Sequence, residues 1–189
     1  QMSELFSIQL QNRQQQGRDG VWLDLPTTTE QVQAALRQIG ISSDNLQGLF
    51  ISGYFAEEEK RFAIPYNMVL ASNVDEVNFL ASRLETLSTG ERAELNAALQ
   101  APQSELFSIG RITDFPENVD YYVHLPDVHG PAQLGDYYLN RSGMVDMPEE
   151  WKGGIDTAQF GRYVAQQEQG VFTQYGYLVK SGDEWQKVH

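Results

Sequence analysis

The segment Ile155–Leu178 reads IDTAQFGRYVAQQEQGVFTQYGYL and predicts a helix, a glycine stop and a strand. Phe160, Tyr163 and Val164 recur at the i, i+3, i+4 spacing of one helix face, which we expect to face the core. A glycine after the helix is a typical C-terminal stop. The alternation from Val171 to Leu178 predicts one strand with two unlike faces.

The same kinds of element occur near the N-terminus. SELFSI (Ser3–Ile8) and VWLDLP (Val21–Pro26) predict two strands. A capping box of Thr27 with Glu30 predicts the start of a helix that ends at a glycine. GLFISGYF (Gly48–Phe55) predicts a third strand, so the expected order is β-β-α-β.

The hexapeptide SELFSI returns at Ser104–Ile109, and related segments follow it in the same order. YYVHLP at Tyr121–Pro126 resembles VWLDLP, and GVFTQYGYL at Gly170–Leu178 resembles GLFISGYF. Between the two sets, capping boxes at Asn73/Glu76 and Ser88/Glu91 predict two helices. We therefore expect two related β-β-(α)-β units flanking a helical block.

This order predicts an α+β protein with two β-rich α/β units flanking a helical block. The expected domains are residues 1–60, a helical domain of residues 61–103, and residues 104–189. We expect the nine-residue tail SGDEWQKVH to be frayed. Leu36, Leu80, Leu84, Phe160 and Tyr163 are the expected core residues.

The composition limits the classes of function. The chain has 189 residues and a formal net charge of −13, from 26 acidic and 13 basic residues, which argues against binding to nucleic acid or to anionic membranes. Cysteine is absent, which excludes disulfides and thiolate chemistry. No apolar run approaches the ~20 residues that span a bilayer, and no signal-peptide pattern occurs, so we expect a cytoplasmic protein.

Motifs for catalysis or cofactor binding are missing from the sequence. There is no GxxxxGK[ST], GxGxxG, GxSxG or HExxH. His124, Asp127 and His129 could meet at a metal, but a strand position followed by a turn explains them more simply. Paired carboxylates leave a hydrolase open as an alternative, although nothing selects one pair. We expect no cofactor, no metal and no enzymatic activity.

The acidic residues are the more informative signal, because they are spread through predicted turns and helix starts. Carboxylates at fixed intervals on a rigid scaffold can imitate a phosphate backbone, although acids at helix N-termini also serve the helix dipole on an ordinary solvated face. The candidate partner-binding carboxylates are Glu57, Glu58, Glu59, Asp114, Glu117, Asp120, Asp127, Asp136, Asp146, Glu149, Glu150 and Asp156.

Three ordered segments carry a family resemblance. NVDEVNFLASRLETL (Asn73–Leu87), DYYVHLPDVHGPAQLGDYYLNRSG (Asp120–Gly143) and the segment Ile155–Leu178 resemble the antirestriction protein ArdA family. GVWLDLP (Gly20–Pro26) fits the opening strand of that family. The resemblance covers nearly the whole chain.

The resemblance implies three small domains in an elongated chain and a homodimer joined through the C-terminal domain. It also implies a function: such proteins mimic bent B-form DNA and bind competitively in the DNA groove of type I restriction–modification enzymes, at the methyltransferase core. They perform no chemistry and are carried by plasmids and conjugative transposons. The alternative is an acidic binding or regulatory module for another basic protein.

Two features limit the resemblance. A dimer would carry about −26, which is the phosphate charge of only about 13 base pairs. The family pattern has acidic residues after Leu49–Ile51, where this chain has Ser52, Gly53 and Tyr54. The acids Glu57–Glu59 come later, so the charge of the N-terminal domain is shifted or reduced.

Overall fold

The chain forms two compact units, each built from several segments. The computed structural model describes residues 4–15 and 19–189. The N-terminal unit comprises Gln1–Ser88, Leu106–Pro116 and Lys187–His189, and the C-terminal unit comprises Thr89–Glu105 and Glu117–Gln186. Each unit combines helices with a small antiparallel sheet, which confirms the α+β class. The division into three domains stays a prediction.

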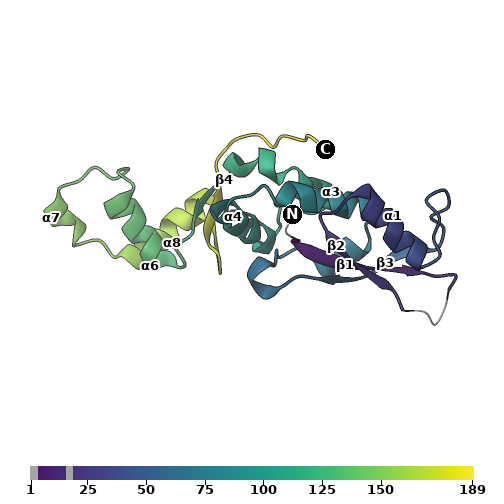
Figure 1. Ribbon diagram of the computed structural model, residues 1–189. Coiled ribbons are helices and arrows are strands. Elements are labelled where there is room, and N and C mark those ends of the chain that lie inside the picture. The colour runs from purple at the N-terminus through teal and green to yellow at the C-terminus, as the bar shows by residue number, and fades with distance from the viewer. Residues whose placement is uncertain (1–3, 16–18) are drawn as a thin grey trace. The chain divides into compact units, whose positions relative to one another are not determined.

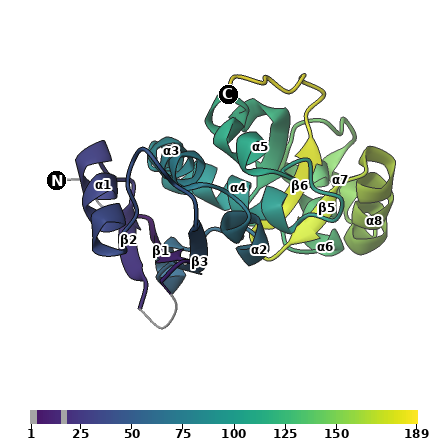
Figure 2. The ribbon, with the colours of Figure 1, turned by 90° about the vertical axis from the view of Figure 1, so that its right-hand side faces the viewer.

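The N-terminal unit is a three-stranded sheet with helices on one side. Its elements are β1 (Phe6–Asn12), β2 (Val21–Leu25), α1 (Thr29–Gln38), β3 (Leu49–Phe55), η1 (Glu58–Lys60), α2 (Tyr66–Leu70), α3 (Val74–Leu84) and α5 (Ile109–Thr113). The strand order is β2-β1-β3, and all pairs are antiparallel. Helices α1 and α3 lie on one side of this sheet (Figures 1 and 2). The predicted β-β-α-β order is confirmed.

Alternation along β1 separates the two faces of this sheet. Phe6, Ile8 and Leu10 are buried, whereas the residues between them are half-buried. Asn78 of α3 ties the connection after β2 to the helical layer, because its side chain accepts from Thr27 N (2.9 Å) and donates to Thr27 O (3.0 Å). The buried face therefore forms one core with the helices.

Capping explains where the helices of this unit begin. Asn73 accepts from Glu76 N (2.9 Å) and donates to the Glu76 carboxylate (2.6 Å), so the predicted box is confirmed. The cap of α1 is Thr28, which accepts from Gln31 N, and not Thr27. The shift by one residue follows from the sequence itself, because Thr28 and Gln31 also fit the capping-box pattern.

The C-terminal unit has its own sheet and longer helical insertions. Its elements are α4 (Thr89–Gln100), η3 (Val119–Tyr121), β4 (Tyr122–Leu125), α6 (Pro131–Asp136), the π-helix η4 (Tyr137–Arg141), α7 (Glu149–Lys152), α8 (Thr157–Glu168), β5 (Val171–Thr173) and β6 (Gly176–Lys180). The short helix η2 (Phe115–Glu117) lies where the chain passes from the first unit to the second. The sheet order is β4-β6-β5, again antiparallel.

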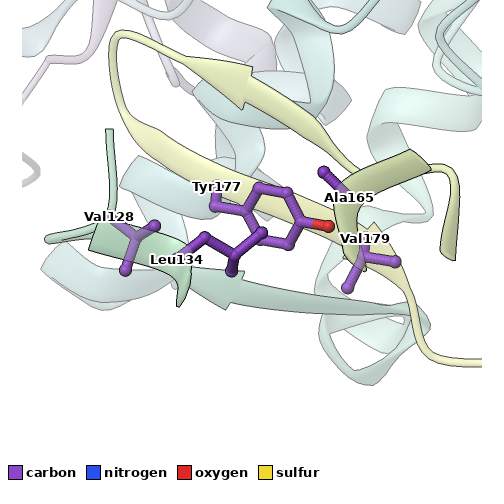
Figure 3. Packing of buried hydrophobic residues seen from close by; sticks show 5 residues of the cluster. All are labelled: Val128, Leu134, Ala165, Tyr177 and Val179. Atoms are coloured by element: carbon purple, nitrogen blue, oxygen red, sulfur yellow. The ribbon is translucent and has the colours of Figure 1, made fainter. Parts of the chain in front are cut away.

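Tyr177 lies at the centre of the core of the C-terminal unit. Its ring is fully buried among Val128, Leu134, Ala165 and Val179 (Figure 3). Its hydroxyl donates to the Glu168 carboxylate at 2.5 Å, and the Tyr138 hydroxyl donates to the same group at 3.0 Å. Burial raises the pKa of both phenols, that of Tyr138 to about 12. These bonds fix the end of α8 against the sheet.

Helices α6 and α8 pack closely through glycines. A Cβ at Gly161 would lie 1.8 Å from Pro131 O, and a Cβ at Gly135 would lie 1.9 Å from Thr157 O. The buried residues of α8 are accordingly Gly161 and Ala165. The prediction that Tyr163 is a core residue is wrong, since its side chain is 60% exposed. Small residues occupy the contact, and the aromatic ring faces solvent.

Three other sequence predictions are also wrong. The second SELFSI is a loop leading to the Ser108 cap of α5, whose hydroxyl accepts from the N–H of Arg111, so the C-terminal unit lacks the first strand of the expected repeat. The segment after Gly170 is the hairpin β5–β6 rather than one strand. The tail is held by pairing with Asn118, which donates to Gln186 O (2.8 Å) and accepts from Gln186 N (2.6 Å).

Candidate partner-binding surface

The candidate carboxylates are exposed, with one exception. The exposed ones are Glu57, Glu58, Glu59, Glu117, Asp120, Asp127, Asp136, Asp146, Glu149, Glu150 and Asp156. Glu57–Glu59 lie at η1 of the N-terminal unit, and the other eight lie in the C-terminal unit. The sequence pattern thus selected residues whose charge reaches solvent.

Asp114 is the exception. Its side chain is 1% exposed, and Oδ1 accepts from the backbone N–H of His189 at 2.8 Å. Asp114 also ends helix α5, so its carboxylate holds the C-terminal tail against the N-terminal unit. The expectation that Asp114 presents a surface charge does not agree with this burial, and we remove it from the candidate set.

Four carboxylates surround a hollow of about 340 Å³ in the C-terminal unit. Glu117 and Asp120 come from the segment before β4, and Asp183 and Glu184 come from the tail after β6. The backbone here is well fixed, because Ser181 donates its hydroxyl to Asp120 O at 2.6 Å. The Trp185 ring also meets that of Tyr121 edge-on at 5.2 Å. We call Glu117, Asp120, Asp183 and Glu184 the acidic hollow.

Asp183 and Glu184 were missed at the sequence level. The tail looked frayed because its sequence is short and polar, and nothing local shows that Asn118 pairs with Gln186, 68 positions along the chain. Only the asparagine near an acidic run offers a hint, since its amide can satisfy both a backbone donor and a backbone acceptor. The hollow depends on this long-range pairing.

Glu94 on α4 interacts electrostatically with Asp120 of the acidic hollow. Burial, together with the nearby charges of Glu91 and Asp120, raises the pKa of its carboxyl group to about 8. Its Oε2 atom is buried and has no hydrogen-bond partner among residues 4–15 and 19–189. Glu94 therefore keeps its proton at neutral pH and adds no negative charge to the hollow.

The carboxylates around α6, α7 and α8 have local roles as well as charge. Asp156 caps α8 by accepting from Ala158 N (3.0 Å) and Gln159 N (3.1 Å). Asp136 lies 3.7 Å from the Arg141 guanidinium, and Glu149 lies 2.8 Å from Lys152 Nζ. The carboxylates of both pairs are exposed, and ion pairs open to solvent contribute at most ~1 kcal/mol. A binding partner that offers several cationic side chains can therefore compete for these carboxylates.

Charge is concentrated in the C-terminal unit. It has 14 acidic and 5 basic residues, for a formal net charge of −9, against 12 acidic and 8 basic residues and −4 in the N-terminal unit. The segments of the C-terminal unit are also the shorter part of the chain. More than two thirds of the net charge of −13 therefore lies on the C-terminal unit.

The alternative metal site finds no support in the geometry. His124 Nε2 lies 2.7 Å from Tyr175 O, so this ring donates to a backbone carbonyl, and Asp127 and His129 are exposed. In the part of the chain that the structure describes, no three His, Cys, Asp or Glu side chains come together as metal ligands would. No helix there is long and apolar enough to cross a membrane.

Comparison with known proteins identifies a family. The model of the family described as antirestriction protein (ArdA) matches residues 16–179. Among curated proteins, none matches the sequence. The matched range includes all eleven exposed candidate carboxylates. It begins after β1 and ends just before Asp183 and Glu184.

Proposed function

Because the chain belongs to the ArdA family of antirestriction proteins, we propose that it inhibits type I restriction–modification enzymes by occupying their DNA-binding groove as a mimic of DNA. The observation that carries this proposal is the set of eleven exposed candidate carboxylates, eight of them on a unit with a net charge of −9. Inhibition would be competitive with DNA and would involve no chemistry and no cofactor.

The physical basis of the proposal is the positive charge of the groove in which an enzyme binds DNA. A groove that binds DNA is lined with lysine and arginine, and binding releases counterions, which makes affinity fall steeply with salt. Carboxylates on a folded scaffold gain from the same effect. They also steer association, because many charges of one sign act together over distance.

Rigid placement of the charges supports mimicry over a merely solvated surface. Asp156 is fixed by its helix cap, and the acidic hollow is fixed by Asn118 and Ser181. A side chain that is already ordered loses less entropy on binding. Two C-terminal units together would carry about −18, which is the phosphate charge of about nine base pairs.

A homodimer formed through the C-terminal unit is part of the proposal. Large apolar side chains are exposed on this unit and favour a protein contact: Val123, Met144, Trp151, Ile155 and Tyr163. We place the protein in the cytoplasm, where restriction enzymes meet incoming DNA.

The enzyme alternative has one feature in its favour. Glu94 keeps its proton at neutral pH beside Asp120, and a carboxyl group of this kind can act as a general acid. Inhibition by mimicry does not require Glu94 to exchange a proton, because its side chain adds no charge beside Asp120. A Glu94→Gln variant should therefore inhibit as the wild type does, whereas any hydrolysis by this pair would be lost.

The test is a DNA methylation and cleavage assay with a panel of type I enzymes at rising salt. We expect inhibition at micromolar protein, competitive with DNA and weaker at 300 mM salt than at 50 mM. Neutralising the acidic hollow with Glu117→Gln, Asp120→Asn, Asp183→Asn and Glu184→Gln should weaken inhibition about ten-fold or more and flatten the salt dependence.

A control of equal charge separates position from net charge. Amide replacement of four exposed acids of the N-terminal unit, Asp19, Glu30, Asp44 and Asp75, removes the same total charge. Equal losses for the two variants would mean that position is unimportant and that mimicry is the wrong mechanism. No inhibition of any enzyme by the wild type, with retention of another basic protein from a host lysate, would favour the acidic binding module.

A further inference from the structure

The outward face of the N-terminal sheet carries exposed aromatic rings. The pairing places Trp22 opposite Gln9, and Gln9 opposite Gly53, across the three strands. The next row along the strands contains Asp24 and Phe55, both opposite Ser7. The helices α1 and α3 cover the other side of the sheet (Figures 1 and 2).

Trp22 lies along this face and does not point away from it. A Cβ at Gly53 would come within 3.0 Å of Trp22 Cη2, so the indole crosses β1 and reaches β3. Glycine at this position leaves room for the ring, and half of the Trp22 side chain (50%) remains exposed. Phe55 in the neighbouring row is 56% exposed. The result is an ordered aromatic surface with one side open.

Carboxylates border the aromatic surface. Asp24 lies two residues from Trp22 on the same face of β2, about 7 Å further along, and its Oδ1 accepts from the Ser7 hydroxyl at 2.6 Å. A hydrogen bond with Asp24 raises the pKa of Glu4, and the charge of Glu57 adds to this effect. The charge of Lys60 lowers the pKa of Glu4, but Lys60 Nζ also lies 4.0 Å from the Glu57 carboxylate, which partly neutralises it. This end of the sheet therefore favours a cation.

The same sheet already stacks one arginine. The Arg13 guanidinium lies 4.6 Å from the centre of the Phe50 ring, and Phe50 is opposite Gln11 at the other end of the outward face. An arginine on an aromatic ring is thus a contact that this surface makes within its own chain. The Trp22 ring, which is the better cation acceptor, is open to a second one.

We propose that the outward face around Trp22 and Phe55 is a docking surface for arginine side chains of a protein partner. Asp24 would pair with the guanidinium that stacks on Trp22. The proposal deepens the proposed function and rests on it for the identity of the partner, which would be the basic enzyme whose groove the C-terminal carboxylates occupy. It gives the N-terminal unit a contact that does not require many acidic residues.

Arginine is favoured over lysine for a physical reason. The guanidinium is planar and weakly hydrated, so it stacks on a ring and still offers N–H groups to a carboxylate in its plane. An ammonium is compact and strongly hydrated, and it gains less from the ring. Stacking is also screened less by salt than the pairing of exposed charges is.

The test compares two peptides on the full chain by NMR of ¹⁵N-labelled protein. One peptide alternates arginine with glycine over seven residues, and the other has lysine in place of arginine. We expect the Trp22 indole N–H to shift with the arginine peptide, and that peptide to bind about three-fold tighter than the lysine peptide, with the preference growing at 300 mM salt. Trp22→Ala should remove the preference, and Trp22→Phe should restore part of it.

Leu46→Ala is the matched control, because Leu46 belongs to the same unit and is exposed to a similar extent (51%). It should leave the preference unchanged. Equal binding of both peptides by the wild type would overturn the inference, as would a preference that survives Trp22→Ala. A change of oligomeric state in Trp22→Ala, measured by sedimentation, would identify a second copy as the occupant and would also overturn it.

Inhibition assays separate this inference from the proposed function. If the wild type inhibits type I enzymes and Trp22→Ala inhibits equally well at 300 mM salt, the docking surface is wrong and the mimicry stands. If the wild type inhibits none of them, the mimicry is wrong, and the peptide comparison still decides whether the surface binds arginine. A loss of potency confined to Trp22→Ala supports both.

Discussion

The replacement Glu94→Gln should make the protein more stable at high pH and leave its stability at low pH nearly unchanged. Burial, together with Glu91 and Asp120, raises the pKa of Glu94 from 4.5 to about 8 in the folded chain. The folded state therefore holds a proton that the unfolded state releases above pH 4.5. The stabilising contribution of this proton is complete below pH 4.5 and is lost as the pH rises to 8.

The size of the effect follows from the same shift. Each pKa unit corresponds to ~1.4 kcal/mol, which sets an upper limit of about 5 kcal/mol. The Glu94 side chain is only half-buried, and solvent screens its charge, so we expect about 2 kcal/mol. For a unit of this size, that is a rise in melting temperature of roughly 10 °C.

Urea unfolding at pH 5 and at pH 9, followed by tryptophan fluorescence, measures the difference. Glu94→Gln should gain stability over the wild type at pH 9 only, and the exposed control Glu150→Gln should show no such pH dependence. Asp120→Asn removes one of the charges that raise the pKa of Glu94, so its NMR titration midpoint should fall. The same gain at both pH values would refute the reasoning, because it would show that ionisation is not the cause.

Two further pairs of variants test the packing and the burial described above. Gly161→Ala should destabilise the C-terminal unit by about 3 kcal/mol, because its Cβ would lie 1.8 Å from Pro131 O. In the control Gly90→Ala, the added Cβ meets no atom within 4 Å, so this variant should be neutral or slightly stabilising. Thermal unfolding followed by circular dichroism compares the two variants. Asp114→Ala should lose about 2 kcal/mol in urea unfolding, because it removes a buried, charged acceptor for the N–H of His189. Exposed Glu117→Ala should change stability by less than about 0.5 kcal/mol, and equal losses would contradict the burial of Asp114.

The parts of the fold that could be predicted are those decided by local signals. The order of elements in the N-terminal unit followed from alternation and from the glycines between segments. The start of α3 followed from the Asn73 cap, whose partner is only three residues away. Exposure of most candidate carboxylates followed from the cost of burying a charge.

The parts that could not be predicted depend on distant partners. In the first SELFSI, Phe6–Ile8 form a strand that β2 and β3 flank, whereas in the second, Phe107 and Ser108 form a loop and the cap of α5. The same residues therefore adopt two structures, because a strand is stable only through its neighbours. Tyr163 is exposed for a similar reason: the close approach of α6 selects the small residues of α8 for the contact, and helical periodicity alone favours the aromatic face.

The candidate site shows the same division. Composition indicated that carboxylates carry the function, but it could not show that Asp114 is buried or that Asp183 and Glu184 join Glu117 and Asp120. Both outcomes involve the tail, which the sequence suggested was frayed and which hydrogen bonds to the side chains of Asn118 and Asp114 hold in place.

This dependence has a consequence for mimicry. DNA presents its phosphates on a stiff duplex, so a protein that replaces it gains most when its carboxylates are already fixed. The acidic hollow combines residues before and after the C-terminal sheet, and Asn118 joins them through two hydrogen bonds. A single amide side chain therefore controls the spacing of four charges, and loss of that spacing would weaken binding even though the net charge stays the same.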